Sequence, residues 1–415
     1  MDLLRVFTCG SVDDGKSTLI GRLLYDSKSV FQEHLQTIEG KDRVGDGELN
    51  LALLTDGLRA EREQGITIDV AYKYFSTPKR KFILADTPGH VQYTRNMVTG
   101  ASLADCAIIL IDARQGILEQ TRRHSFIAHL LEIPHLIVCI NKMDLVDFSE
   151  KRYQEIKDEF SNLCKSLSFS KITLIPISAL KGDNIVNKST NMPWYRDEPL
   201  LDHLESWIIT PRVQSGSRFL NQYIIRPQDS QYHDFRGYAG IIRSGEFQVG
   251  DKITVYPQNL SSTISEIWYS GVKTTSTQTN DSVIFQLEDD MDISRGDIFV
   301  RSTDAVKTTS LFRAKLTHLD SAPLKLNSPY EMMIGTRLVK AMVKSVETKL
   351  DLTDLIFKPT SPNVQLNEIA EVTIKTATPI LFDSFESNWA TGSAILIDPQ
   401  THMTAAALMF EESLG

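Results

Sequence analysis

The chain of 415 residues has few cysteines, no long hydrophobic run and no surplus of basic residues. Its four cysteines show neither a CxxC pair nor metal-ligand spacing, which argues against a disulfide framework or a zinc site and suits a reducing compartment. No window approaches the roughly 20 apolar residues of a membrane-spanning helix, and the opening MDLLRVFTCG does not read as a signal peptide. The formal net charge of −9 does not indicate nucleic-acid binding. We therefore expect a cytoplasmic protein with neither a membrane nor a nucleic acid as its partner.

Strand-like and helix-like segments alternate through the first half of the chain, which predicts an α/β domain with a mostly parallel sheet and helices on both faces. The expected strands are 3–9, 69–76, 81–86, 106–113, 135–144 and 171–180, and the expected helices are 16–27, 118–131, 149–164 and 200–207. The segment ITPRVQSGS has the composition of a linker, and the short runs beyond it predict only strands. We expect the α/β domain at 1–209 and two β-barrel domains at 217–303 and 304–415.

The segment GSVDDGKST, at 10–18, follows the first expected strand and opens the first expected helix. It fills the pattern G-x-x-x-x-G-K-S/T, which is typical of a phosphate-binding loop. Glycines let backbone N–H groups converge on phosphate oxygens, and the N-terminus of the helix adds positive charge. The lysine side chain can reach the β- and γ-phosphates, and the serine hydroxyl can bind Mg²⁺. The predicted loop residues are Gly10, Ser11, Val12, Asp13, Asp14, Gly15, Lys16, Ser17 and Thr18.

The segment DTPGH follows the expected strand 81–86 and supplies a second set of phosphate contacts. Asp86 can hold Mg²⁺, usually through water, and the N–H of Gly89 can meet the γ-phosphate. Thr67, in EREQGITID, can reach both Mg²⁺ and the γ-phosphate. The predicted metal ligands are therefore Ser17, Thr67 and Asp86.

Two motifs at later strand ends indicate which base is bound. In NKMD, at 141–144, the Asp144 carboxylate can accept hydrogen bonds from N1–H and the 2-amino group of guanine, and adenine offers neither donor. In ISAL, at 177–180, the backbone N–H of Ala179 can contact the guanine carbonyl. Each motif alone is weak, but together and in this order they predict a GTP-binding domain. The predicted base-side residues are Asn141, Lys142, Asp144, Ser178, Ala179 and Leu180.

The combined pattern resembles the translation-factor class of GTPases, which also joins an α/β domain to two β-barrels. That resemblance implies that His90 positions the attacking water, with Val12 and Ile66 as an apolar gate beside it. It implies that Asp13 is an acid near the phosphates, and that an outside partner completes the catalytic site. The resemblance and the phosphate-loop motif together predict four catalytic residues, which are His90, Gly89, Thr67 and Lys16.

Ser11 and Asp14 separate this chain from the translation factors, which typically have histidines at both positions. GSVDDGKST instead resembles the GTPase subunit of heteromeric bacterial sulfate adenylyltransferase, and SALKGDNIV, MPWY, DFRGYAG and TGSAILID resemble that family as well. The resemblance implies that GTP hydrolysis here is coupled to formation of adenosine 5′-phosphosulfate and pyrophosphate from ATP and sulfate. It also implies a separate catalytic small subunit, an ATP-binding protein with a pyrophosphate loop. The chain itself agrees with this division, because besides its one phosphate-binding loop it has no pyrophosphate loop for ATP.

Some members of that family carry a C-terminal kinase that phosphorylates the product. The chain stops near the expected end of the second barrel and holds no second phosphate-loop pattern, so we expect no kinase here. Two alternatives stay open: an elongation-factor-like GTPase that delivers aminoacyl-tRNA, and a GTP-dependent scaffold without turnover. The conformation of residues 30–60, the partner surface and the coupling mechanism do not follow from the sequence.

Overall fold

In the computed structural model, two compact units are formed by Met1–Thr210 with Asp351–Ile356, and by Pro211–Leu350 with Phe357–Gly415. The structure describes residues 2–28, 43–44, 48–49, 51–54, 69–90, 94–209, 212, 214–227, 235–359 and 361–415. Thr67, Ile66 and most of 30–60 lie outside these residues. The domain boundaries expected at 209/217 and 303/304 stay predictions.

The first unit is built on a six-stranded sheet of order β4-β5-β1-β6-β7-β8. Its strands are β1 (Leu3–Gly10), β4 (Ala71–Ser76), β5 (Lys81–Asp86), β6 (Cys106–Asp112), β7 (His135–Asn141) and β8 (Lys171–Pro176). Neighbouring strands are parallel except for β4 and β5, which form an antiparallel hairpin. Every residue of β6 and β7 is buried, as expected for continuous apolar runs covered on both faces.

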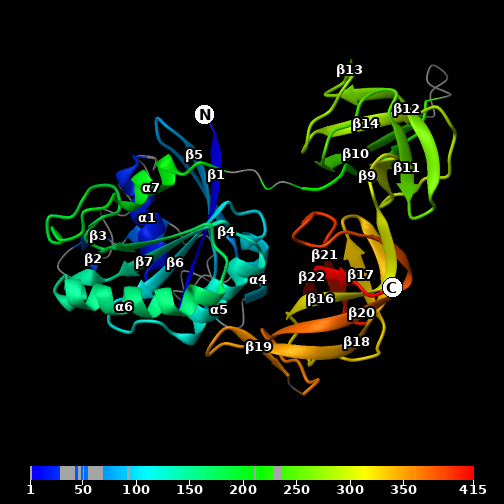
Figure 1. The fold of residues 1–415 in the computed structure, drawn as a ribbon. Helices are drawn as coiled ribbons and strands as arrows, with labels where there is room; N and C mark the ends of the chain where they lie inside the picture. Colours follow the sequence, from blue (N-terminus) through cyan, green and yellow to red (C-terminus); the bar gives the residue numbers. More distant parts are fainter. Residues whose placement is uncertain are drawn as a thin grey trace. The chain divides into compact units, whose positions relative to one another are not determined.

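Helices cover both faces of this sheet (Figure 1), as the alternation predicts: α1 and α7 lie on one face and α5 and α6 on the other. The helices are α1 (Lys16–Asp26), α4 (Thr94–Ala101), α5 (Glu119–Leu130), α6 (Glu150–Leu163) and α7 (Leu200–Ser206). Short 3-10 helices are η1 (Leu51–Leu54), η3 (Met143–Val146) and η4 (Cys164–Ser166), and β2 (Arg43–Val44) pairs with β3 (Glu48–Leu49). In α6, Ser149 caps the N-terminus by accepting a hydrogen bond from Arg152 N–H.

The second unit contains two six-stranded antiparallel barrels. The first runs β11-β15-β9-β10-β14-β12 and closes through β11–β12 pairing, with β13 added outside. The second runs β17-β21-β22-β16-β20-β18 and closes through β17–β18 pairing, with β19 added outside. The first barrel's strands are β9 (Arg218–Ile225), β10 (Gly237–Ser244), β11 (Lys252–Tyr256), β12 (Leu260–Tyr269), β13 (Val272–Thr274), β14 (Ser282–Leu287) and β15 (Ile298–Arg301). The second barrel's are β16 (Lys307–His318), β17 (Tyr330–Ile334), β18 (Arg337–Asp351), β19 (Ile356–Pro359), β20 (Ile369–Phe382), β21 (Ser393–Ile397) and β22 (Thr404–Ser413).

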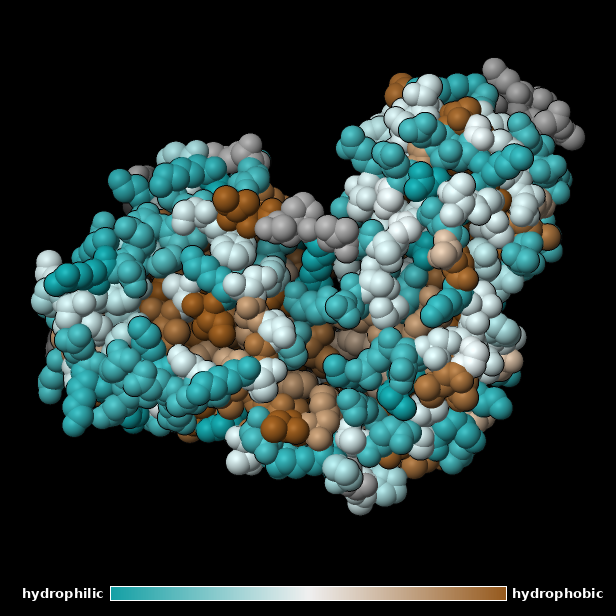
Figure 2. All heavy atoms as spheres, viewed as in Figure 1, coloured by the Kyte–Doolittle hydropathy of each residue, from teal (hydrophilic) through white to brown (hydrophobic). Residues whose placement is uncertain are grey.

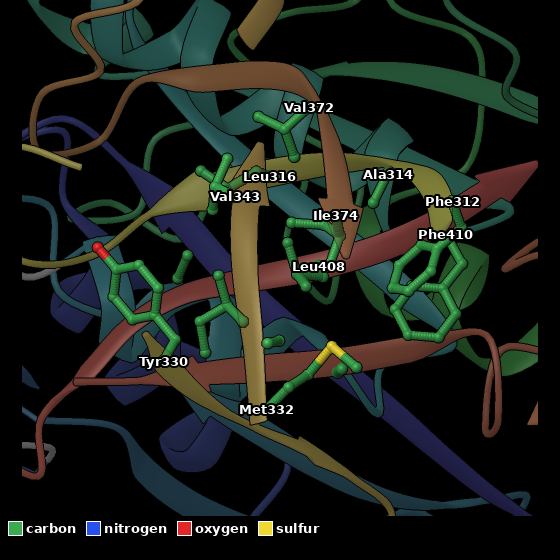
Figure 3. Close-up of a cluster of buried hydrophobic side chains, with 14 of the residues drawn as sticks. Phe312, Ala314, Leu316, Tyr330, Met332, Val343, Val372, Ile374, Leu408 and Phe410 are labelled. Atoms are coloured by element: carbon green, nitrogen blue, oxygen red, sulfur yellow. The ribbon is translucent and has the colours of Figure 1, made fainter. Parts of the chain in front are cut away.

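Each barrel has its own apolar core, made from alternate residues along its strands that face inward. In the second barrel, Phe312 and Phe410 pack with ring centroids 4.5 Å apart and belong to the same buried cluster as Leu316 and Leu408 (Figure 3). In the first, Phe219 and Phe285 pack with centroids 4.4 Å apart. The predicted fold class, an α/β domain followed by two β-barrels, is confirmed.

A buried ion pair and a small apolar cluster join the two barrels. Arg218, 2% exposed, donates from Nε and Nη2 to the two carboxylate oxygens of Asp383 at 2.9 and 2.8 Å. Leu220 of the first barrel packs in one cluster with Leu381 of the second.

The visible surface is mostly hydrophilic, with separate hydrophobic patches (Figure 2). Among the described residues, no helix is long and apolar enough to cross a membrane.

Candidate nucleotide-binding site

The predicted phosphate loop lies between the end of β1 and the start of α1. Gly15 has φ +93°, and a Cβ there would lie 2.5 Å from Asn141 Nδ2, so only glycine fits both the conformation and the close approach. Lys16 is buried and donates to the carbonyl oxygens of Gly10 at 3.0 Å and Ser11 at 2.7 Å. Its ammonium therefore spans the loop whose N–H groups would hold phosphate. Burial lowers the pKa of Lys16, and the Asp14 and Asp86 carboxylates oppose that shift.

Asp14 places a buried carboxylate inside this loop. It is 2% exposed, and its Oδ2 accepts a hydrogen bond from Ser11 N–H at 2.5 Å. Burial raises the pKa of Asp14 to about 6, with Lys16 and the Ser11 N–H acting in the opposite direction. The Asp14 carbonyl accepts a hydrogen bond from Asn141 Nδ2 at 2.7 Å. The loop is thus held from within by a carboxylate and from outside by the NKMD motif.

The DTPGH segment lies against the phosphate loop. Thr87 is buried, and its hydroxyl donates to the carbonyl of Thr8 in β1 at 2.5 Å. A Cβ at Gly89 would lie 2.4 Å from Lys16 Nζ and 2.8 Å from the Gly10 carbonyl oxygen. The backbone at Gly89 therefore lies so close to the phosphate loop that a residue with a side chain would not fit there. His90 follows directly and is half-buried. The structure therefore brings Gly89 beside Lys16.

The predicted magnesium ligands in the described residues are oxygen donors. Asp86, 1% exposed, ends β5, and Ser17 lies in the first turn of α1. No group of three or more histidine, cysteine or acidic side chains could hold a metal by itself in the described part of the chain. A hydroxyl and a carboxylate suit Mg²⁺, which keeps several waters and is completed by substrate phosphates. The donor set fits that ion, and Thr67 lies outside the described residues.

The base-side motifs meet at the ends of β7 and β8. Asn141, 1% exposed, joins them to the phosphate loop, because its Nδ2 donates to Asp14 and its Oδ1 accepts from Ala179 N–H at 2.9 Å. Asp144 Oδ1 accepts a hydrogen bond from the Ser178 hydroxyl at 2.6 Å, which fixes the orientation of its carboxylate. Because the Ala179 N–H already donates to Asn141, its contact with a guanine carbonyl stays a prediction.

Asp112 and Arg114 support this region, and we did not predict them. Asp112, 1% exposed, lies 2.9 Å from Lys142 Nζ through its Oδ2 and accepts two hydrogen bonds from the Arg114 guanidinium at 3.0 and 2.6 Å. Burial would raise the pKa of Asp112, but hydrogen bonds from Arg114 and Lys142 outweigh it and lower that pKa to about 2. Lys142 also donates to the Asp13 carbonyl. The only signal in the sequence was an acid at the end of an apolar strand, and the β6–β7 register that pairs it with Asn141 comes from the structure.

Comparison with protein families assigns both ends of the chain. Residues 1–211 match the family model described as the elongation factor Tu GTP binding domain. Residues 311–411 match the model described as GTP-eEF1A C-terminal domain-like.

Comparison with curated proteins gives similarity over nearly the whole chain. A sulfate adenylyltransferase subunit 1 of Shewanella woodyi is 46% identical, covering 100% of this chain and 88% of its own. One of Francisella tularensis subsp. novicida is 47% identical with the same coverage. A bifunctional enzyme CysN/CysC of Mycobacterium tuberculosis (strain ATCC 25618 / H37Rv) is 48% identical over 98% of this chain and 67% of that protein. The solved structure of sup35 complexed with GDP is 24% identical with a TM-score of 0.45, covering 100% of this chain and 95% of that one, and adds nothing to the assignment.

Proposed function

The chain belongs to the family of sulfate adenylyltransferase subunit 1, and on that premise we propose that it is the GTP-hydrolysing subunit of that enzyme. GTP and water would give GDP and phosphate here, and this turnover would drive formation of adenosine 5′-phosphosulfate and pyrophosphate from ATP and sulfate. The adenylyl transfer would take place on a separate small subunit. One observation best supports GTP as the nucleotide: the NKMD motif is joined to the phosphate loop by the hydrogen bond from Asn141 to the Asp14 carbonyl, and its Asp144 carboxylate is oriented by Ser178.

The residues of the loop divide the binding of GTP between them. Lys16 and the N-terminus of α1 would neutralise the phosphates, and Gly89 N–H would meet the terminal phosphate. Asp144 would accept the guanine N1–H and 2-amino hydrogens with a carboxylate held by Ser178. Ser17 and Asp86, with Thr67, would hold Mg²⁺, which neutralises charge that develops on the phosphates during transfer.

His90 is the residue proposed to orient the attacking water. The close approach of the neighbouring Gly89 to the phosphate loop supports a role for His90 at the phosphate end of the site rather than at the base end. Because orientation of the nucleophile is most of what a protein supplies in phosphoryl transfer, loss of this side chain would affect turnover more than binding.

The test is GTP hydrolysis by the chain together with the small subunit, in the presence of ATP and sulfate. We expect His90→Ala to bind GTP nearly as well as the wild type and to lose stimulated hydrolysis by about a hundredfold or more. His129→Ala, on α5 and in none of the nucleotide motifs, is the matched control and should turn over normally. Unchanged stimulated turnover of His90→Ala would remove His90 from the mechanism, and absence of GTP binding by the wild type would refute the proposal itself.

A further inference from the structure

Arg22 connects the phosphate-binding helix to the base-side loop. It lies on α1, and its side chain is 12% exposed. Its Nε donates to the carbonyl of Ala179 at 3.3 Å, and its Nη2 donates to the carbonyl of Leu180. Its stem also packs against the turn at Gly182, where a Cβ would lie 3.8 Å from the Arg22 Cδ. One guanidinium thus holds two successive peptide groups of the ISAL segment.

The planarity of these peptide groups carries the effect of Arg22 to the other side of the loop. In a trans peptide the C=O and N–H point in opposite directions. With the Ala179 carbonyl directed at Arg22, the N–H of Leu180 is turned away from α1. The Ala179 N–H is already committed to Asn141 at 2.9 Å. The Leu180 N–H is therefore the donor whose direction Arg22 sets.

The second peptide group links Arg22 to Asp144. The Leu180 carbonyl accepts from Arg22, and the N–H of the same peptide group, on Lys181, donates to the Ser178 hydroxyl at 3.2 Å. That hydroxyl in turn donates to Asp144 Oδ1 at 2.6 Å. Hydrogen bonds in such a chain polarise and orient one another.

We propose that Arg22 is a positioning residue for base selection, which sets the direction of the Leu180 N–H and steadies the Asp144 carboxylate for guanine. This inference rests on the proposed GTP binding and adds to it the residue that holds the base-reading groups in place. Arginine suits this task because its planar fork serves two acceptors at once, whereas a lysine ammonium acts as a point charge.

The test separates guanine recognition from phosphate binding in the full-length chain. Displacement of a fluorescent GDP derivative measures the affinities for GTP, GDP and inorganic tripolyphosphate, which has the phosphates but no base. We expect Arg22→Ala to weaken GTP and GDP equally, by about tenfold, as when hydrogen bonds to a charged donor are lost. Tripolyphosphate affinity should stay unchanged. Arg22→Lys should lie between the wild type and Arg22→Ala.

Asp26→Asn is the matched control, because it removes only the 3.7 Å ion pair of Arg22 and leaves both carbonyl contacts in place. It should bind GTP as the wild type does. Unchanged GTP affinity in Arg22→Ala, or equal weakening of GTP and tripolyphosphate, would overturn the inference. If Arg22→Ala does not fold, Arg22→Lys decides, and wild-type GTP affinity in that variant would overturn it. Failure of the wild type to bind GTP would refute the proposed function instead.

Discussion

At the residue scale, Asp14 places negative charge where the loop is expected to receive an anion. Its carboxylate is buried and accepts one backbone hydrogen bond, from Ser11 at 2.5 Å. Burial raises the pKa of Asp14 to about 6, above the ordinary value of 3.8. The charged form is therefore less favourable in the folded chain than in the unfolded one, and Asp14 costs stability as the pH rises from 3.8 through about 6.

Replacing Asp14 by Asn tests this cost in the nucleotide-free chain. The amide oxygen can still accept the Ser11 hydrogen bond, but no buried charge forms. We expect Asp14→Asn to be more stable than the wild type at pH 8, by on the order of 2 kcal/mol, with the difference shrinking toward pH 5. Denaturant unfolding at the two pH values measures it, and Asp13→Asn, at the exposed neighbouring position, is the control. A stability difference between Asp14→Asn and the wild type that is the same at both pH values would show that ionisation of Asp14 is not its cause.

Asp144 provides the residue-scale test of base selection. An asparagine there would present an amide donor to the 2-position of the base, where xanthine has a carbonyl in place of the amino group of guanine. We expect Asp144→Asn to lose GTP affinity by about a hundredfold, because hydrogen bonds to a carboxylate are lost, and to gain affinity for xanthosine triphosphate. Asp147→Asn, whose side chain is exposed, should leave GTP binding intact. Survival of GTP affinity in Asp144→Asn would show that another group reads the base.

At the element scale, parallel strands bring the site together. β1, β5, β6 and β7 end at Gly10, Asp86, Asp112 and Asn141, and parallel pairing places these ends along one edge of the sheet. The sequence predicted the sheet, and it predicted a nucleotide-binding motif at the ends of β1, β5 and β7. It did not predict Asp112, since IDARQG reads as an ordinary turn until the β6–β7 register sets it beside Lys142. Arg22 was missed for a similar reason, because its partners lie in a loop over 150 residues away.

The contact between the DTPGH segment and the phosphate loop can be tested with one methyl group. In Gly89→Ala the new Cβ would lie 2.8 Å from the Gly10 carbonyl oxygen, so the two segments must move apart. We expect GTP hydrolysis to fall by about tenfold to a hundredfold, because a small displacement misaligns the reacting groups, while GDP binding changes little. Gly415→Ala, with nothing within 4 Å of its Cβ, is the control. Normal hydrolysis by Gly89→Ala would mean that the segments separate during turnover.

At the scale of the whole molecule, the second unit depends on a buried ion pair between its barrels. Arg218→Ala would leave Asp383, 7% exposed, with a buried charge that retains only the Thr391 hydroxyl as a side-chain donor among the described residues. We expect a loss of about 3 kcal/mol or more in the free energy of unfolding of this unit, measured by denaturant unfolding. Arg313→Ala, which removes an exposed pair with Glu412, should cost less than about 1 kcal/mol. Equal effects of the two changes would contradict the role given to the buried pair.

The order of domains was predictable because the two halves of the chain use different periodicities, and the barrels contain none of the nucleotide motifs. No sequence motif in residues 218–413 indicates what the barrels do in the proposed enzyme. The strands predict barrels, but the surface that holds another subunit depends on side chains brought together only by barrel closure.

The most direct measurement is pyrophosphate release from ATP and sulfate by this chain co-purified with its small subunit, with and without GTP. The proposed function predicts strong stimulation by GTP in the wild type and none in the His90→Ala complex, although that complex still binds GTP. Active GTP hydrolysis without any effect on pyrophosphate release would contradict the coupling of the two reactions.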